Sequence, residues 1–183
     1  FGGPSSPSFS QWSEGQARER DHLRRARRAV KIYFDTALLV KAYVEEETSP
    51  LADTLLREAT IPVAFTGLHG LEVRTALRLK RFRGELTAAE LAGALDALQS
   101  DLAAGLLAKP DLDLEAVFHR AEALSAKHAA ETGARSLDTL HVAAAVELDA
   151  DAFASFDDRQ RAMARKAGLK LLPAKRHERA RST

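Results

Sequence analysis

Short apolar runs alternate with longer stretches of helical periodicity from residue 30 onward. The runs expected to be strands lie at 30–34, 61–66, 151–156 and 169–172, with a short additional run at 105–109. Apolar residues recur with helical spacing at 36–44, 51–59, 68–82, 87–102, 114–130, 137–148 and 158–167. Strands that alternate with helices predict an α/β fold, with a central parallel sheet and helices on both faces.

Local signals mark several of the expected helix ends. Thr87, with Glu90 three residues later, is typical of a capping box at a helix start. Gly133 is expected to end the helix before it, and Ser136 to cap the next one. Pro173 is expected to end the last strand.

Size and composition limit the class of protein. The chain has 183 residues, of which 45% are hydrophobic, enough for one domain with a real core. It has no cysteine, which excludes disulfides, cysteine-ligated metals and thiol catalysis and favours a cytoplasmic location. No run approaches the roughly 20 apolar residues that cross a bilayer, so no membrane association is expected.

Basic residues are concentrated toward the two ends of the chain. Residues 1–29 are rich in Gly, Pro, Ser and Arg, and are interpreted as a disordered basic tail or leader, with an RNA-binding arm as the alternative. Their arginine pairs do not fit a twin-arginine export signal, because Lys31, Asp35 and Lys41 interrupt the apolar segment that should follow. The folded domain is expected at 30–173, and a basic C-terminal tail at 174–183.

Four acidic residues stand where solvation alone explains them poorly. Asp35 follows the first strand, Glu72 lies in an apolar helical stripe, Asp138 opens an alanine-rich helix, and Asp157 follows the strand at 151–156. In parallel α/β folds, ligands bind beyond the carboxyl ends of the strands, where these acids are expected. A set of carboxylates without thiolates suits Mg²⁺ or Mn²⁺, so the sequence predicts a divalent-metal site.

Each acid also has a structural explanation. Asp35 and Asp157 are well placed as helix N-caps, and Asp138 lies in a first turn, where a negative charge is favourable. Glu72 is the most diagnostic, because its spacing from Leu68, Ala76 and Leu79 predicts that it faces inward, where an unpaired carboxylate is costly.

In combination, these segments resemble a PIN domain and, within that family, a VapC-type toxin ribonuclease. The resemblance rests on the segments around the four acids, at 31–41, 71–74, 136–145 and 155–159, and extends from about residue 30 to 172. It implies a PIN-like three-layer fold, Mg²⁺- or Mn²⁺-dependent endoribonuclease activity, a homodimer, and a cognate antitoxin protein as partner.

The resemblance also assigns roles to single residues. It makes Asp35, Glu72, Asp138 and Asp157 the catalytic and metal-binding quartet. Thr36 and Ser155 match its supporting hydroxyl positions. Asp158 is an alternative fourth acid, and Asp157 is favoured because it comes directly after the strand.

Basic residues on and beyond the Glu72 helix are candidates for contacts with RNA phosphates. They are Arg74, Arg78, Lys80, Arg81 and Arg83, with a solvated helix end as the alternative. His69 and His141 each lie three residues from one of the acids, but histidines near helix starts are more often structural than ligands.

Three other functions were compared with the ribonuclease hypothesis. A phosphohydrolase of the haloacid-dehalogenase type usually has a second Asp two residues after the first, where this chain has Ala37. A dinucleotide-binding protein would need a glycine-rich turn after the first strand, which this chain lacks. A non-catalytic PIN-like RNA-binding module stays open, because a fold does not fix a function.

Overall fold

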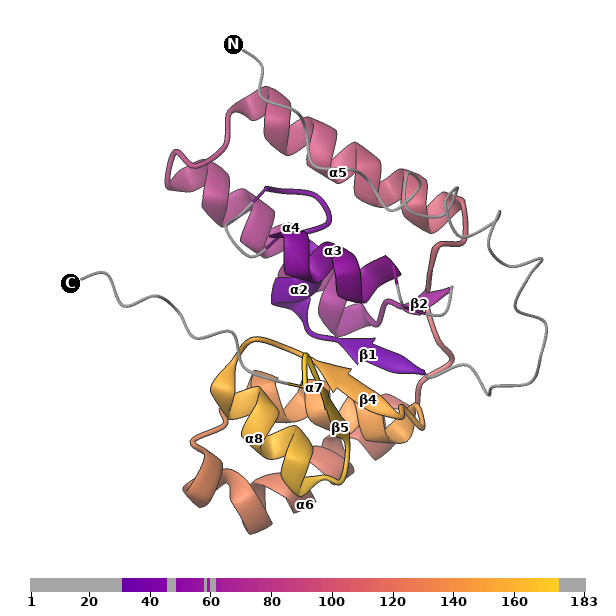
Figure 1. Ribbon diagram of the computed structural model, residues 1–183, viewed down its shortest axis with the longest axis vertical. Coiled ribbons are helices and arrows are strands. Elements are labelled where there is room, and N and C mark those ends of the chain that lie inside the picture. The colour runs from indigo at the N-terminus through magenta and orange to yellow at the C-terminus, as the bar shows by residue number, and fades with distance from the viewer. Residues whose placement is uncertain (1–30, 46–48, 58, 60–61, 175–183) are drawn as a thin grey trace.

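The structure is a computed structural model, and it describes residues 31–45, 49–57, 59 and 62–174. Over these residues the chain is a mixed α/β protein with short parallel sheets and seven helices (Figure 1). The predicted N-terminal tail at 1–29 and nearly all of the predicted C-terminal tail lie outside the described residues. None of the described helices combines the length and the apolar character that crossing a membrane requires.

All strand pairs among the described residues are parallel, as predicted. Strands β1 (Ile32–Phe34), β4 (Ala152–Ala154) and β5 (Lys170–Leu172) form one sheet in the order β1-β4-β5. A separate two-stranded sheet pairs β2 (Val63–Ala64) with β3 (Leu107–Ala108). The strands are thus shorter than the apolar runs suggested, and they form two hydrogen-bonded sheets instead of one.

The helices follow the predicted order. They are α2 (Thr36–Val40), α3 (Ser49–Arg57), α4 (Gly67–Phe82), α5 (Ala88–Ala103), α6 (Leu114–Thr132), α7 (Ser136–Glu147) and α8 (Asp158–Lys166). The helix predicted at 36–44 ends early, at Val40. Its continuation tightens because the N–H groups of Lys41, Ala42 and Tyr43 donate to carbonyls three residues back rather than four.

Capping signals in the sequence were partly right. Thr87 and Glu90 form the predicted capping box, in which the Glu90 carboxylate accepts the Thr87 N–H at 2.7 Å. Ser136, however, is the first residue of α7 and not its cap. The side chain of Asp138 satisfies the helix start instead, because it accepts the backbone N–H of Arg135 at 2.9 Å.

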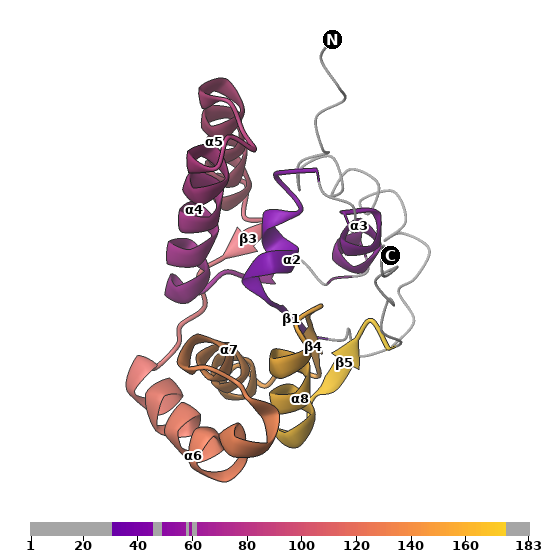
Figure 2. The ribbon, with the colours of Figure 1, turned by 90° about the vertical axis from the view of Figure 1, so that its left-hand side faces the viewer.

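The two faces of the β1-β4 pair are buried in two different cores. Phe34 and Ala154 pack with apolar residues of α2, α3, α4 and α5, whereas Tyr33 and Phe153 pack with residues of α6, α7 and α8. Successive side chains of a strand point to opposite faces, so each strand supplies both cores. Figure 2 shows the two groups of helices, with the strands between them.

We expect the Phe153→Ala substitution to lower the free energy of unfolding by about 3–5 kcal/mol, because it leaves a cavity at a side chain that is 0% exposed. Urea unfolding, followed by circular dichroism, measures the loss. The matched control is Phe82→Ala, at a side chain that is 87% exposed, where a change within about 0.5 kcal/mol is expected. Equal losses in the two variants would contradict the assignment of Phe153 to the core.

Candidate active site

The carboxyl ends of β1 and β4 meet at one edge of the sheet and place two of the predicted acids there. The backbone N–H of Asp35 donates to the carbonyl of Ala154 at 2.9 Å, which extends the strand pairing by one residue. Ser155 and Asp157 follow directly on the neighbouring strand, and the Ser155 hydroxyl accepts the Asp157 N–H at 2.9 Å. The edge predicted from the sequence thus carries Asp35 together with Ser155 and Asp157.

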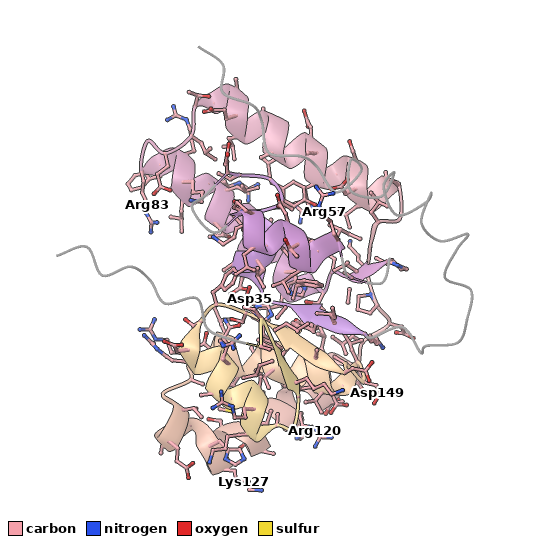
Figure 3. All side chains as sticks on the ribbon, viewed as in Figure 1. Asp35, Arg57, Arg83, Arg120, Lys127 and Asp149 are labelled. Carbon is pink, nitrogen blue, oxygen red and sulfur yellow. The ribbon has the colours of Figure 1, made fainter. Side chains whose placement is uncertain are left out.

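Asp35 uses one carboxylate oxygen as a helix cap and leaves the other without a partner. Its Oδ1 atom accepts the Leu38 N–H at 2.7 Å, which confirms the N-cap interpretation. The residue is 1% exposed, and its Oδ2 atom is buried without a hydrogen bond. Asp35 lies near the middle of the molecule (Figure 3). The helix cap explains the position of Oδ1, whereas the buried and unpaired Oδ2 atom needs another explanation.

Burial raises the pKa of Asp35 above its ordinary value. The Ser155 hydroxyl, the Leu38 N–H and His141 offset part of this rise in the pKa, whereas the charge of Asp157 adds to it. The main cause of the raised pKa at Asp35 is therefore desolvation, and repulsion from a second acid is a smaller one. The repulsion between Asp35 and Asp157 indicates that these two carboxylates lie close enough to affect each other.

Glu72 lies beside the buried face of α4 and not at its centre. The residues of that face are His69, Val73 and Leu77, whereas Leu79 of the predicted stripe is 43% exposed. The Glu72 side chain is 22% exposed. The predicted stripe is therefore right only in part, because Leu68, Glu72 and Ala76 are half-buried at the border of the buried face and Leu79 is exposed. The sequence alone did not show which side of α4 the core covers.

Two hydrogen bonds converge on one oxygen of Glu72. Its Oε2 atom accepts the hydroxyl of Thr36 at 2.5 Å and pairs with Nε2 of His141 at 2.5 Å. Burial raises the pKa of Glu72, but the interactions with His141 and Thr36 outweigh it, so the pKa is lowered overall. Glu72 is thus held in its charged form by partners from two distant segments of the chain.

The side chain of Gln160 connects Asp138 with Asp157. Its Nε2 amide donates to Asp138 Oδ1 at 3.2 Å, while its backbone N–H donates to Asp157 Oδ1 at 3.1 Å. Asp157 is also the N-cap of α8, as its structural interpretation predicted. Asp158 is the first residue of α8 and is exposed. The charge of Asp157 contributes to the raised pKa of Asp35.

The four acids do not form a closed cluster. Within the described ranges, no three His, Asp or Glu side chains converge on one point where they would hold a metal ion. Asp35 is instead coupled to Asp157 by charge, Asp157 to Asp138 through Gln160, and Glu72 to Thr36 and His141 by hydrogen bonds. The unpartnered Asp35 Oδ2 and the oxygen-only donors fit a hard divalent cation.

The two histidines are both buried, at 0% and 1% exposed, and His69 has the structural role expected of a histidine near a helix start. His69 completes a capping box with Thr66, whose backbone N–H donates to His69 Nδ1 at 3.1 Å. Burial lowers the pKa of His69 to about 3, so its ring is neutral. His141 contacts Glu72 directly. The sequence feature that pointed to His141 was its position one helical turn after Asp138.

The candidate RNA-binding residues divide into two groups. Arg74 donates to the Gly70 carbonyl at 2.9 Å, while Lys80 and Arg83 lie 2.9 and 3.9 Å from the Glu85 carboxylate. Arg78 and Arg81 are exposed on the same helix, α4. These two have the side chains best placed for a phosphate.

No protein-family model matches the chain, and no curated protein matches its sequence.

We expect the Asp35→Asn variant, without metal, to be more stable than the original protein near neutral pH, by on the order of 1–3 kcal/mol. The folded protein holds a proton on Asp35 more tightly than the unfolded chain does, so its stability falls as pH rises from the unfolded pKa to the raised folded pKa. The gap between the proteins should therefore widen with rising pH.

Urea unfolding at several pH values, in the presence of EDTA, measures this gap. The matched control is Asp111→Asn, at an exposed carboxylate, whose stability should follow that of the original protein at every pH. A gap that stays constant with pH would contradict the raised pKa of Asp35.

Proposed function

We propose that the protein is a metal-dependent endoribonuclease with a PIN-like three-layer fold. The observation that carries this proposal is the buried Asp35 Oδ2 atom, which has no partner at a sheet edge where Asp157 adds a second negative charge. An unpartnered carboxylate oxygen is costly to bury, and a divalent cation would satisfy it. The negative charge of Asp157 nearby favours a cation at this oxygen.

In such a site, some residues of the chain would bind the metal ion and others would position the metal-binding residues. Asp35, Asp138 and Asp157 would hold Mg²⁺ or Mn²⁺, and Glu72 would supply a fourth carboxylate. Thr36 and Ser155 orient Glu72 and the segment of Asp157 through their hydroxyls. When bound, such an ion lowers the pKa of an attacking water and offsets charge on the phosphoryl group.

The resemblance to VapC-type toxins extends the proposal to a biological role. The protein would be the cytoplasmic toxin of a toxin–antitoxin pair, a homodimer inhibited by a cognate antitoxin. Support comes from α4, which exposes Leu71, Leu79 and Phe82 at 66%, 43% and 87%. Exposed apolar residues on one helix are typical of surfaces that bind another protein.

Cleavage of a total-RNA pool tests the proposed activity. With Mg²⁺ or Mn²⁺ the protein should produce discrete fragments, and with EDTA it should produce none. Asp35→Asn should reduce the rate roughly 100-fold or more, since even residues around metal ligands contribute about 10- to 100-fold. The control Asp96→Asn changes an exposed acid of α5 and should leave the rate unchanged.

The same experiment separates the ribonuclease from a non-catalytic RNA-binding module. The preparation must be folded, free of antitoxin and able to bind RNA. If Asp35→Asn and the original protein then give the same fragment pattern, the binding module is correct. Equal activity with EDTA and with Mg²⁺ would also overturn the metal-dependent reaction.

The exposed arginines of α4 give a separate prediction for substrate binding. We expect each of Arg78→Gln and Arg81→Gln to weaken RNA binding and to reduce the slope of log K against log salt by about 0.7, the value for one phosphate contact on a single strand. Filter binding at several salt concentrations measures the slope. The control is Arg120→Gln on α6, which lies at the opposite end of the molecule from Arg83 (Figure 3) and should keep the original slope.

A further inference from the structure

A buried chain of hydrogen bonds lies behind Glu72. The Tyr33 hydroxyl is 2.9 Å from Nδ1 of His141, and Nε2 of His141 is 2.5 Å from Oε2 of Glu72. Thr36 donates its hydroxyl to the same oxygen at 2.5 Å. Tyr33 and His141 are each 1% exposed, so these contacts are shielded from water. They join β1, α2, α4 and α7 at one point.

The carboxylate defines how protons are arranged along this chain. Glu72 is charged and can only accept, so the proton of the His141 ring lies on Nε2 and is donated to Oε2. The Tyr33 hydroxyl pairs with Nδ1 of the same ring. Burial, with the nearby charges of Glu72 and Asp35, raises the pKa of Tyr33, which keeps its hydroxyl protonated. Thr36 and His141 thus both donate to the same oxygen of Glu72.

His69 supports the chain by packing and does not take part in it. Its ring centroid lies 4.9 Å from that of Tyr33 and 5.0 Å from that of His141. Both of its nitrogens are already used, since Nε2 donates to the Phe34 carbonyl at 2.9 Å and Nδ1 accepts from Thr66. Because His69 is fixed at both nitrogens, it limits how far the rings of Tyr33 and His141 can move.

Building on the proposed function, we propose that His141, held by Tyr33, is the positioning residue for Glu72 in the metal site. Because His141 and Thr36 both hydrogen-bond to Oε2, only the Oε1 atom of Glu72 stays available to bind an ion. Among the described residues, Oε1 of Glu72 receives no hydrogen bond. Glu72 would then bind a cation through one oxygen and at a fixed orientation. Partners behind a ligand typically change metal affinity by about 10- to 100-fold.

The two tyrosines of the chain provide a matched test. Tyr33→Phe removes the hydroxyl that holds His141. Tyr43→Phe removes a partly buried hydroxyl that donates to Asp101 at 3.0 Å, outside the chain of contacts. Titration of Mn²⁺ by calorimetry should show binding at least about 10-fold weaker in Tyr33→Phe than in Tyr43→Phe. Thermal unfolding confirms that both variants are folded.

A pair of variants at His141 separates positioning from packing. His141→Gln keeps an N–H donor for Glu72, and His141→Leu fills the space without one. We expect Mn²⁺ affinity to be largely retained in the first variant and lost by about 10- to 100-fold in the second, with the KM for RNA unchanged in both. In the metal-free original protein, nitrogen-15 spectra should show the His141 ring proton on Nε2, protected from exchange.

The outcomes distinguish the two proposals. If the original protein binds no Mn²⁺ and cleaves no RNA, the proposed function fails. If the original protein binds Mn²⁺ and Tyr33→Phe binds it as tightly as Tyr43→Phe does, the function stands and the positioning role of His141 is wrong. Equal losses in His141→Gln and His141→Leu would likewise assign His141 to packing alone.

Discussion

The parallel pairing of β1 with β4 is the contact on which the rest of the structure depends. It aligns Ile32 with Ala152 and Phe34 with Ala154, residues 120 positions apart. The paired strands supply side chains to both hydrophobic cores, and they also end at the same edge, where Asp35 and Ser155 follow. One register thus sets the packing of the protein and the position of its acids. A slip by one residue would exchange the two faces and remove Asp35 from the edge.

Arg161 secures the other side of this edge. Its guanidinium is buried and donates to the backbone carbonyls of Ser155, Leu172 and Pro173 at 2.9–3.0 Å. These carbonyls lie at or just beyond the ends of β4 and β5, and Arg161 supplies each of them with a donor. Arg161 belongs to α8, whose N-cap is Asp157. The helix that carries the fourth acid is therefore tied to the strands by several charge-assisted hydrogen bonds.

Short-range features of the chain predicted the fold well, and long-range contacts explain where prediction failed. The strand before Asp35, the caps at Thr87 and Asp157, and the helix stop at Gly133 follow from residues within a few positions of each other. The partners of Glu72 lie 36 and 69 positions away in sequence, so no local pattern could identify them. The buried face of α4 lies to one side of the predicted stripe for the same reason, because α2 and α5 pack against this helix.

The four candidate acids are oriented in two different ways, three by nearby backbone groups and one by a distant side chain. Asp35, Asp138 and Asp157 are oriented by backbone N–H groups within three residues, so their positions follow from local folding. Glu72 is oriented by His141 of α7, across the boundary between the helices around α4 and those around α6 and α8 (Figure 1). Because His141 belongs to the other group of helices, the orientation of the Glu72 carboxylate depends on how the two cores are placed relative to each other. The hydrogen bond from His141 therefore couples the assembly of the site to the packing of the whole domain, which a locally capped acid cannot do.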